Sequence, residues 1–234
     1  MLFRSGAVVV AAVIAARQVV AAARQPVIKL AATKRTPELQ LQPRQRWHLF
    51  LSHVWSSGQD QCATIKRQLT LLLPTSSIFL DVDDLESIDK LEEYVDASAV
   101  IMIFVSMGYF KSGNCLREAR KTLEVDKPIA LMHDSAVYHK SHMSLQAIKQ
   151  QECPDDLRGP IFNGRDVIEW HRIKDFQMVS LKLLAAEMLL GILGNTSTGP
   201  IELFVPGEQP GKRLMLHTNV VIFASPDKIG RAHV

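Results

Sequence analysis

Polar side chains that can do chemistry follow four apolar segments of the chain. They are Ser52, His53 and Trp55 after the first segment, Asp81, Asp83 and Asp84 after the second, Ser106 after the third and His133 after the fourth. Carboxylates and imidazoles act as general acids and bases or bind divalent cations, and an indole stacks on planar rings. Proton transfer, metal binding and recognition of an aromatic ring are therefore the chemistries to weigh.

Two metal-binding interpretations of these residues are disfavoured. The acids of Asp81 to Asp84 would suit the Mg²⁺ pocket of a receiver domain, but that pocket also needs a carboxylate where this chain has Ser106. The spacing of His133, His139 and His142 matches no zinc-binding pattern. We therefore predict no metal site, and a solvated turn with a helix cap remains an alternative for the acids.

The three cysteines are Cys62, Cys115 and Cys153. Their number is odd and their spacing is wide, which suits neither a disulfide framework nor a metal site. We therefore expect a reducing, cytoplasmic compartment. Cys115 has no histidine placed by the sequence to activate it, so we interpret it as a buried structural cysteine.

Hydrophobic patterning predicts the strands and helices that must position these residues. The predicted strands are 48–52, 78–82, 100–106, 128–133 and 166–170, and the predicted helices are 58–73, 114–125 and 176–190, with a further helix face from Leu85 to Ala99. Five strands interleaved with helices predict an α/β, flavodoxin-like, doubly wound five-stranded parallel sheet flanked by helices. The carboxyl ends of its strands share one edge, which brings the polar residues together.

Two further features of this pattern bear on function. Residues 135–165 form a long polar excursion with one predicted helical piece at 143–151. The chain contains neither GxGxxG nor GxxxxGK[ST], which disfavours a classical dinucleotide-binding dehydrogenase and a P-loop NTPase.

The charge of the chain is distributed unevenly. The net charge is +3, but residues 1–46 hold eight bases and one acid, whereas residues 47–227 hold 17 bases and 23 acids. The basic pI of about 8.8 therefore reflects the N-terminal arm, and we predict no nucleic-acid partner for the domain. The longest apolar run of the arm, Gly6 to Ala16, is shorter than the roughly 18 residues of a spanning helix, so we predict no membrane segment.

Three parts are predicted along the chain. Residues 1–46 are a basic, Ala/Arg-rich arm that is not expected to fold by itself, residues 47–193 are the domain, and residues 194–234 are a linker and the start of a second unit. Residues 228–234 read as one translation frame of a short-read sequencing adapter, and residues 2–5 read as a frame of its reverse complement. We therefore expect the chain to be a fragment.

Three motifs carry a resemblance to a known family. They are Phe50-Leu-Ser52 in the first strand, Phe79-Leu-Asp81 with the following loop and Leu85, and the segment from Gly108 to Glu118, which ends in Ser-Gly-Asn-Cys-Leu-Arg-Glu. Together they resemble the Toll/interleukin-1 receptor (TIR) domain, particularly the divergent forms of unicellular eukaryotes. The resemblance covers residues 47–193.

This resemblance implies an NAD⁺ glycohydrolase in which Glu118 is the catalytic residue. A carboxylate can stabilise or intercept the oxocarbenium-like centre that forms when the nicotinamide–ribose bond breaks. NAD⁺ would be the substrate, with no separate cofactor, and the products would be nicotinamide and linear or cyclic ADP-ribose. The implied substrate-binding residues are Ser52, His53, Trp55, Asp81, Asp83 and Cys115. Such an enzyme would act in stress, immune or cell-death signalling.

A second function remains open, which is a non-catalytic TIR interaction module. In the family, the loop that corresponds to Asp81 to Ile88 mediates assembly, so this chain would self-associate or recruit other TIR domains through it. Glu118 also has a simpler interpretation, as a helix-surface glutamate three residues before Lys121.

Overall fold

A parallel sheet of five strands lies between two layers of helices. The computed structural model describes residues 26–84, 90–134, 143–194 and 201–207. From edge to edge the strands are β3 (Ile78–Phe79), β2 (Trp47–Ser52), β4 (Ser98–Val105), β5 (Ile129–Asp134) and β6 (Val167–Trp170), and all neighbours are parallel. In chain order this is the flavodoxin-like sequence 2-1-3-4-5, so the predicted fold class is confirmed.

The central strands are buried on both faces, and their side chains alternate between two cores. In β2, Leu49 and Leu51 join one core, whereas Trp47 and Phe50 join the other. Successive side chains of a strand point to opposite faces, so an uninterrupted apolar run supplies both cores at once.

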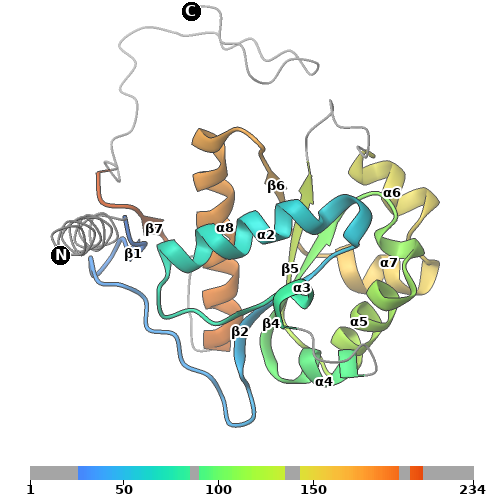
Figure 1. Cartoon of the computed structure of the whole chain (residues 1–234), viewed down its shortest axis with the longest axis horizontal. Helices are drawn as coiled ribbons and strands as arrows, with labels where there is room; N and C mark the ends of the chain where they lie inside the picture. The colour runs from blue at the N-terminus through green and yellow to red at the C-terminus, as the bar shows by residue number, and fades with distance from the viewer. Residues whose placement is uncertain (1–25, 85–89, 135–142, 195–200, 208–234) are drawn as a thin grey trace, which may run out of the picture.

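Each core is covered by its own layer of helices (Figure 1). The helices α2 (Trp55–Leu72) and α8 (Lys174–Leu193) cover one face of the sheet. The other face is covered by α4 (Leu91–Asp96), α5 (Gly113–Glu124), α6 (Leu145–Gln151) and α7 (Asp155–Phe162).

The chain around the second strand differs from the prediction. β3 ends at Phe79, and Asp81–Asp84 forms a short helix, α3. The reason is local, because a carboxylate oxygen of Asp84 accepts a hydrogen bond from the Leu80 N–H at 2.9 Å and folds the chain back. Ala99 lies in β4 and not on a helix, and the rest of the predicted helix face falls partly on residues 85–89, outside the described residues.

The excursion between β5 and β6 contains a helix that the sequence did not predict. α7 carries Gly159 and Pro160, both of which lower helix propensity. Its buried residues Leu157 and Ile161 are nevertheless four positions apart on one face, and they pack into the core beside α5. Residues 135–142, which include His139 and His142, lie outside the described residues.

The segments that flank the predicted domain also pack against it. β1 (Lys29–Leu30) and β7 (Leu203–Phe204) form an antiparallel pair. Ile28 and Val205, next to these strands, are buried in the core that α2 and α8 cover. The core therefore continues past both predicted boundaries, Trp47 and Leu193.

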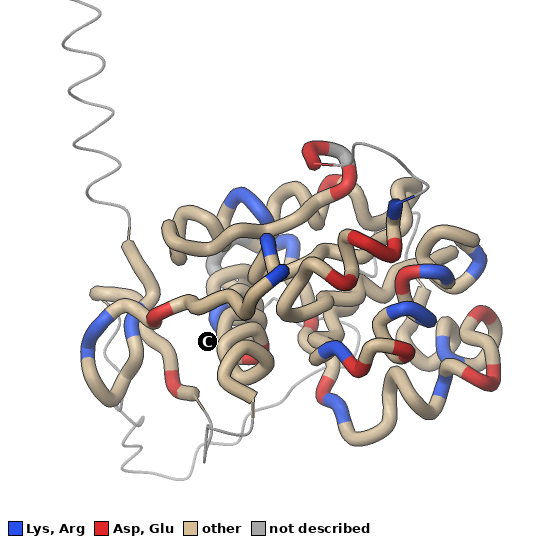
Figure 2. The backbone as a smooth tube through the Cα atoms, turned by 90° about the horizontal axis from the view of Figure 1, so that it is seen from below, with Lys and Arg blue, Asp and Glu red and all other residues tan. Residues whose placement is uncertain are grey.

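Charged residues of both signs are mixed along the described chain, and one helix is long and apolar. Figure 2 shows Lys and Arg interspersed with Asp and Glu along the described backbone. Among the described residues, Phe176–Leu193 of α8 is the one stretch long and apolar enough to cross a membrane by length and composition. A third of that stretch is buried inside the fold, which is its sheet-facing side.

Candidate active site

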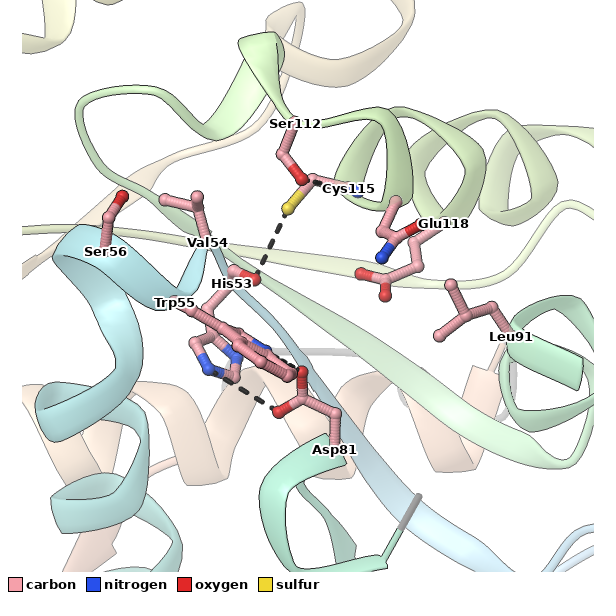
Figure 3. A pocket seen from close by; sticks show the side chains of 10 residues that line it. His53, Val54, Trp55, Ser56, Asp81, Leu91, Ser112, Cys115 and Glu118 are labelled. Carbon is pink, nitrogen blue, oxygen red and sulfur yellow. Dashed lines mark hydrogen bonds and ion pairs between the residues drawn. The ribbon is translucent and has the colours of Figure 1, made fainter. Parts of the chain in front are cut away.

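A pocket of about 380 Å³ opens at the carboxyl edge of the sheet, where β2 and β3 end and α5 begins (Figure 3). It is lined by His53, Val54, Trp55, Ser56, Asp81, Leu91, Ser112, Asn114, Cys115 and Glu118. Ligands of open α/β sheets bind at this edge. The position of the pocket therefore makes it the candidate ligand-binding site of this fold.

α5 carries the lining residues on one side of the pocket. Ser112 caps the helix, and its side-chain oxygen accepts a hydrogen bond from the Cys115 N–H at 3.4 Å. The buried residues Cys115, Glu118, Ala119 and Thr122 follow helical spacing, so they share one face. That face meets the end of β2 and brings a carboxyl group to the pocket wall.

Glu118 is buried, with 5% of its surface exposed. In Figure 3 its side chain points from α5 toward the space bounded by Trp55, Asp81 and Leu91. The alternative interpretation, a surface glutamate beside Lys121, is therefore wrong. Lys121 instead forms ion pairs with Asp96 and Glu124, at 3.7 Å and 3.2 Å.

Two hydroxyl groups support the Glu118 carboxylate from behind. The Ser52 hydroxyl donates to Oε2 of Glu118 at 2.6 Å, and the Tyr109 hydroxyl lies 2.6 Å from the Ser52 oxygen. Ser52 has one proton to donate, so Tyr109 must donate to Ser52 when Glu118 is ionised. Tyr109 is fully buried in the 3₁₀ helix η2 (Tyr109–Lys111), and burial raises the pKa of its phenol well above the usual value.

The environment of Glu118 favours its protonated form. Burial raises the pKa of its carboxyl group to about 8, the charge of Asp81 also raises this pKa, and the Ser52 hydrogen bond opposes the shift. Among the described residues, Glu118 forms no ion pair. A cation that entered the pocket would therefore favour the ionised carboxylate.

Three residues form the opposite wall. The Trp55 indole N–H donates to a carboxylate oxygen of Asp81, and the other oxygen lies 3.6 Å from Nε2 of His53. His53 is fixed by its Nδ1, which lies 3.1 Å from the Leu51 carbonyl oxygen, and by its Nε2, which lies 3.2 Å from the Gln59 side-chain oxygen. Trp55 keeps 60% of its surface exposed, so its ring is oriented by Asp81 and accessible to a ligand.

Cys115 lines the pocket as a thiol. Its sulfur donates to the His53 carbonyl oxygen at 3.3 Å. Burial, followed by the charge of Glu118, raises the pKa of the thiol to about 12. A thiol with this pKa is not a nucleophile near neutral pH, which agrees with its interpretation as a structural cysteine.

The pocket brings together five of the seven predicted site residues, namely His53, Trp55, Asp81, Cys115 and Glu118. Ser52 lies behind the wall and reaches the site through Glu118. Asp83 is not among the lining residues, because its half-exposed side chain turns toward Lys66 and forms an ion pair at 3.0 Å. The predicted assembly loop, 81–88, falls partly on residues outside the described ranges.

The sequence did not single out Tyr109 or Leu91 as site residues. Tyr109 belongs to the segment Gly108 to Glu118 that carries the resemblance, but nothing in the sequence indicates that its side chain reaches back to β2. Leu91 fits the apolar face of a helix and reads as a core residue. Contacts between distant segments, such as the one between Ser52 and Tyr109, leave no local signal in a sequence.

In the described ranges, no group of three or more His, Cys, Asp or Glu side chains is arranged to hold a metal ion. Two of the acids after β3 are instead paired with Lys66, which lies 3.0 Å from Asp83 and 2.6 Å from Asp84.

The comparisons with known proteins return similar solved structures only. No protein-family model and no curated protein sequence matches this chain. The TIR domain of the Toll-related receptor TRR-2 from Hydra magnipapillata is similar at 11% identity and a TM-score of 0.41, over 61% of this chain and 98% of that one. A TIR-STING receptor from C. gigas, solved with 2',3'-cGAMP, is similar at 12% identity and a TM-score of 0.44. This likeness covers 67% of the present chain and 42% of the receptor chain. Both of these structures contain a TIR domain, and the fold description above rests on strand order and packing alone.

Proposed function

We propose that this domain is a TIR-type NAD⁺ glycohydrolase that cleaves the nicotinamide–ribose bond. The observation that carries the proposal is the buried Glu118 carboxyl group in the wall of a pocket that also presents an exposed indole. A buried acid with a raised pKa in the wall of a cleft is a candidate functional group. NAD⁺ is proposed as the substrate because the motif that contains Glu118 resembles that of TIR domains.

The chemistry follows from one carboxylate. The bond between the ribose C1′ and the nicotinamide nitrogen breaks, and its electron pair leaves with neutral nicotinamide. The ribose carbon then carries positive charge, which ionised Glu118 stabilises or captures. Water adds to that carbon and releases one proton, giving ADP-ribose. A hydroxyl or ring nitrogen of the same substrate can add in place of water and give a cyclic product.

The substrate itself would switch Glu118 into its active form. The nicotinamide ring of NAD⁺ is cationic, and a nearby cation lowers the pKa of a carboxyl group. The exposed face of Trp55 would stack on this ring. The ten described lining residues include no lysine or arginine, so the pocket suits the nicotinamide–ribose end, and the pyrophosphate would remain at its mouth.

Nicotinamide release from NAD⁺ tests this function. We expect release by the full chain at concentrations high enough for assembly, and a loss of at least about 100-fold in Glu118→Ala. Glu124→Ala is the matched control, because Glu124 lies on the same helix with an exposed side chain that pairs with Lys121. Folded protein that releases no nicotinamide at any concentration would leave the chain as a TIR-type interaction module.

A further inference from the structure

A buried carboxylate outside the pocket holds the turn that leads into α5. Glu152 directly follows α6, and 1% of its side-chain surface is exposed. Its Oε2 accepts a hydrogen bond from the Gly108 N–H at 2.8 Å, and its Oε1 lies 3.1 Å from Nζ of Lys111. Gly108 precedes η2 and Lys111 is its last residue, so one carboxylate contacts this 3₁₀ helix at both of its ends.

The burial of this charge ties it to one shape of the turn. A carboxylate that leaves water loses its hydration, and only donors and cations placed around it compensate that loss. The Gly108 N–H and the Lys111 ammonium are so placed only while η2 keeps its present conformation. The Lys111 side chain is itself 68% exposed, so water screens the ion pair and the Gly108 hydrogen bond is the stronger constraint.

The turn is held from both layers of helices. Gly108 has a φ of 86°, in the left-handed region that glycine adopts without strain. From the side of α2, the Ser57 hydroxyl donates to the Met107 carbonyl oxygen at 2.8 Å. From the side of α6, Glu152 accepts from the next residue along the turn. The path of the backbone through Gly108 is therefore fixed by contacts with segments far away in the sequence.

This turn carries the hydroxyl that supports the site. Tyr109 comes directly after Gly108, and its hydroxyl lies 2.6 Å from the Ser52 oxygen. Ser52 in turn donates to Oε2 of Glu118 at 2.6 Å. A continuous chain of contacts thus runs from Glu152, through the backbone of the turn, to the carboxyl group in the pocket wall.

We propose that Glu152 is a positioning residue of this site, which holds the Gly108 N–H and thereby keeps the Tyr109 hydroxyl on Ser52 and the Ser52 hydroxyl on Glu118. Glu152 is not among the residues that line the pocket, so it acts through Tyr109 and not on a ligand. Its role in catalysis rests on the proposed NAD⁺ glycohydrolase function, whereas its effect on Glu118 is independent of that function.

Two variants separate positioning from a direct effect of charge. Glu152→Ala removes the charge and the acceptor of the Gly108 hydrogen bond, whereas Glu152→Gln removes the charge and keeps an amide oxygen as acceptor. Positioning predicts that Glu152→Ala weakens the support of the ionised Glu118 carboxylate and raises the pKa of this group. A direct effect of charge has the opposite sign, since removing an anion lowers the pKa of a neighbouring carboxyl group, and it would be equal in the two variants.

Carboxyl ¹³C NMR titration of the full chain measures this pKa without any substrate, and the Glu118 signal is assigned by its loss in Glu118→Gln. We expect Glu152→Ala to raise the pKa as far as Tyr109→Phe does, and Glu152→Gln not to raise it. In a Tyr109→Phe background, Glu152→Ala should have no further effect, because both changes break the same chain of contacts. Asp134→Ala is the matched control, since Asp134 also pairs with a base, Arg172, but lies outside the pocket lining and should leave the pKa unchanged.

Nicotinamide release provides the second readout. We expect kcat/KM for NAD⁺ to fall about tenfold in Glu152→Ala, as for the loss of one hydrogen bond near a charge, and to recover in Glu152→Gln. A folded chain that releases no nicotinamide but shows the expected NMR shifts would support the positioning of Glu118 and refute the proposed reaction alone.

Three results would overturn the proposal. They are a pKa of Glu118 that Glu152→Ala leaves unchanged or lowers, an equal rise in Glu152→Ala and Glu152→Gln, and additive effects of Glu152→Ala and Tyr109→Phe. Circular dichroism establishes that each variant folds. Glu152→Met fills a similar volume without an acceptor for the Gly108 N–H, and it gives the same test if Glu152→Ala does not fold.

Discussion

Glu118 combines a buried position with an ionisable group, and the two oppose each other. A carboxylate loses its hydration when it is buried, so the neutral form is favoured up to a pH near 8. The Ser52 hydroxyl, itself supported by Tyr109, compensates this loss in part by donating a short hydrogen bond. The site thus holds a carboxyl group whose burial keeps it neutral near pH 7, and the proposed cationic substrate would shift it toward the ionised form.

The burial of Glu118 makes the stability of the fold depend on pH. The pKa of its carboxyl group in the folded protein, about 8, exceeds its ordinary value of 4.5, so the folded state binds the proton more tightly. This contribution to stability is fully present below pH 4.5 and is lost as the pH rises toward 8. The Glu118→Gln variant lacks this pH-dependent contribution to stability. We expect the difference in unfolding free energy between wild type and variant to fall over this range by on the order of a few kcal/mol.

Urea unfolding at a series of pH values measures this difference. Comparing the two proteins removes the contribution of the histidines, which both share. Parallel stability curves for wild type and Glu118→Gln would contradict the raised pKa of the carboxyl group.

Tyr109 is expected to act as a positioning residue. Tyr109→Phe removes the hydroxyl that supports Ser52 and keeps the buried ring, so the ionised carboxylate loses part of its support. We expect kcat/KM for NAD⁺ to fall about tenfold and the pKa in its pH profile to rise, as the loss of one hydrogen bond near a charge implies. A profile unchanged in position, with a loss of stability only, would assign Tyr109 a purely structural role.

At the level of elements, the start of α5 fixes the site. The Ser112 cap sets where the helix begins, and the helix then places Cys115 and Glu118 on the face toward β2. The Ser52 side chain comes from the other side, because β2 ends there. A small change in the first turn of α5 therefore moves the carboxylate relative to its support.

The cap of α5 can be tested against an equivalent cap elsewhere. Ser144 caps α6 by accepting a hydrogen bond from the Ala147 N–H at 3.2 Å, away from the pocket. Ser112→Ala and Ser144→Ala should each lower stability by about 1 kcal/mol. Only Ser112→Ala should also lower the rate of nicotinamide release. Equal rates in the two variants would mean that the cap does not position Glu118.

The sequence predicted the sheet and its helices well but the local turns less well. Long apolar runs such as 100–106 identify a central strand because both of its faces are buried. Around Asp81 to Asp84 the hydropathy pattern did not predict a helical turn, because the turn depends on one hydrogen bond from the Leu80 N–H to the Asp84 carboxylate. α7 was missed because Gly159 and Pro160 argue against a helix that tertiary packing nevertheless stabilises.

The candidate site was predicted in part. The shared edge of the parallel sheet follows from the sequence, whereas individual side-chain contacts do not. Residues that follow the strands lie at one edge of a parallel sheet, so His53, Trp55 and Asp81 were expected near one another, whereas Glu118 was added to them only by the resemblance to TIR domains. Which of these side chains face inward depends on individual contacts. Asp83 turns toward Lys66, and Ser52 turns toward Glu118, and neither direction follows from spacing along the chain.

Over the whole molecule, the core extends beyond the part that the sequence delimits. The β1–β7 pair joins residues before and after the predicted domain, and Ile28 is fully buried beside α2 and α8. Activity and stability are therefore best measured on the full chain and not on residues 47–193.

A core substitution outside the predicted boundary tests this extension. Ile28→Ala should lower the free energy of unfolding by about 2–4 kcal/mol, since it removes a fully buried side chain. Thr36→Ala serves as a control in the same segment, because the Thr36 side chain is exposed. An unchanged unfolding midpoint for Ile28→Ala would show that this segment does not unfold together with the sheet.

The central claim, that Glu118 is the catalytic carboxylate of an NAD⁺ glycohydrolase, is tested most directly by kcat/KM for nicotinamide release as a function of pH. We expect equal amounts of nicotinamide and linear or cyclic ADP-ribose, a rate that rises with pH through a single ionisation near 8, and no activity in Glu118→Gln. A folded wild-type chain that leaves NAD⁺ intact across this range, or a Glu118→Gln variant that cleaves NAD⁺ at the wild-type rate, would contradict the claim.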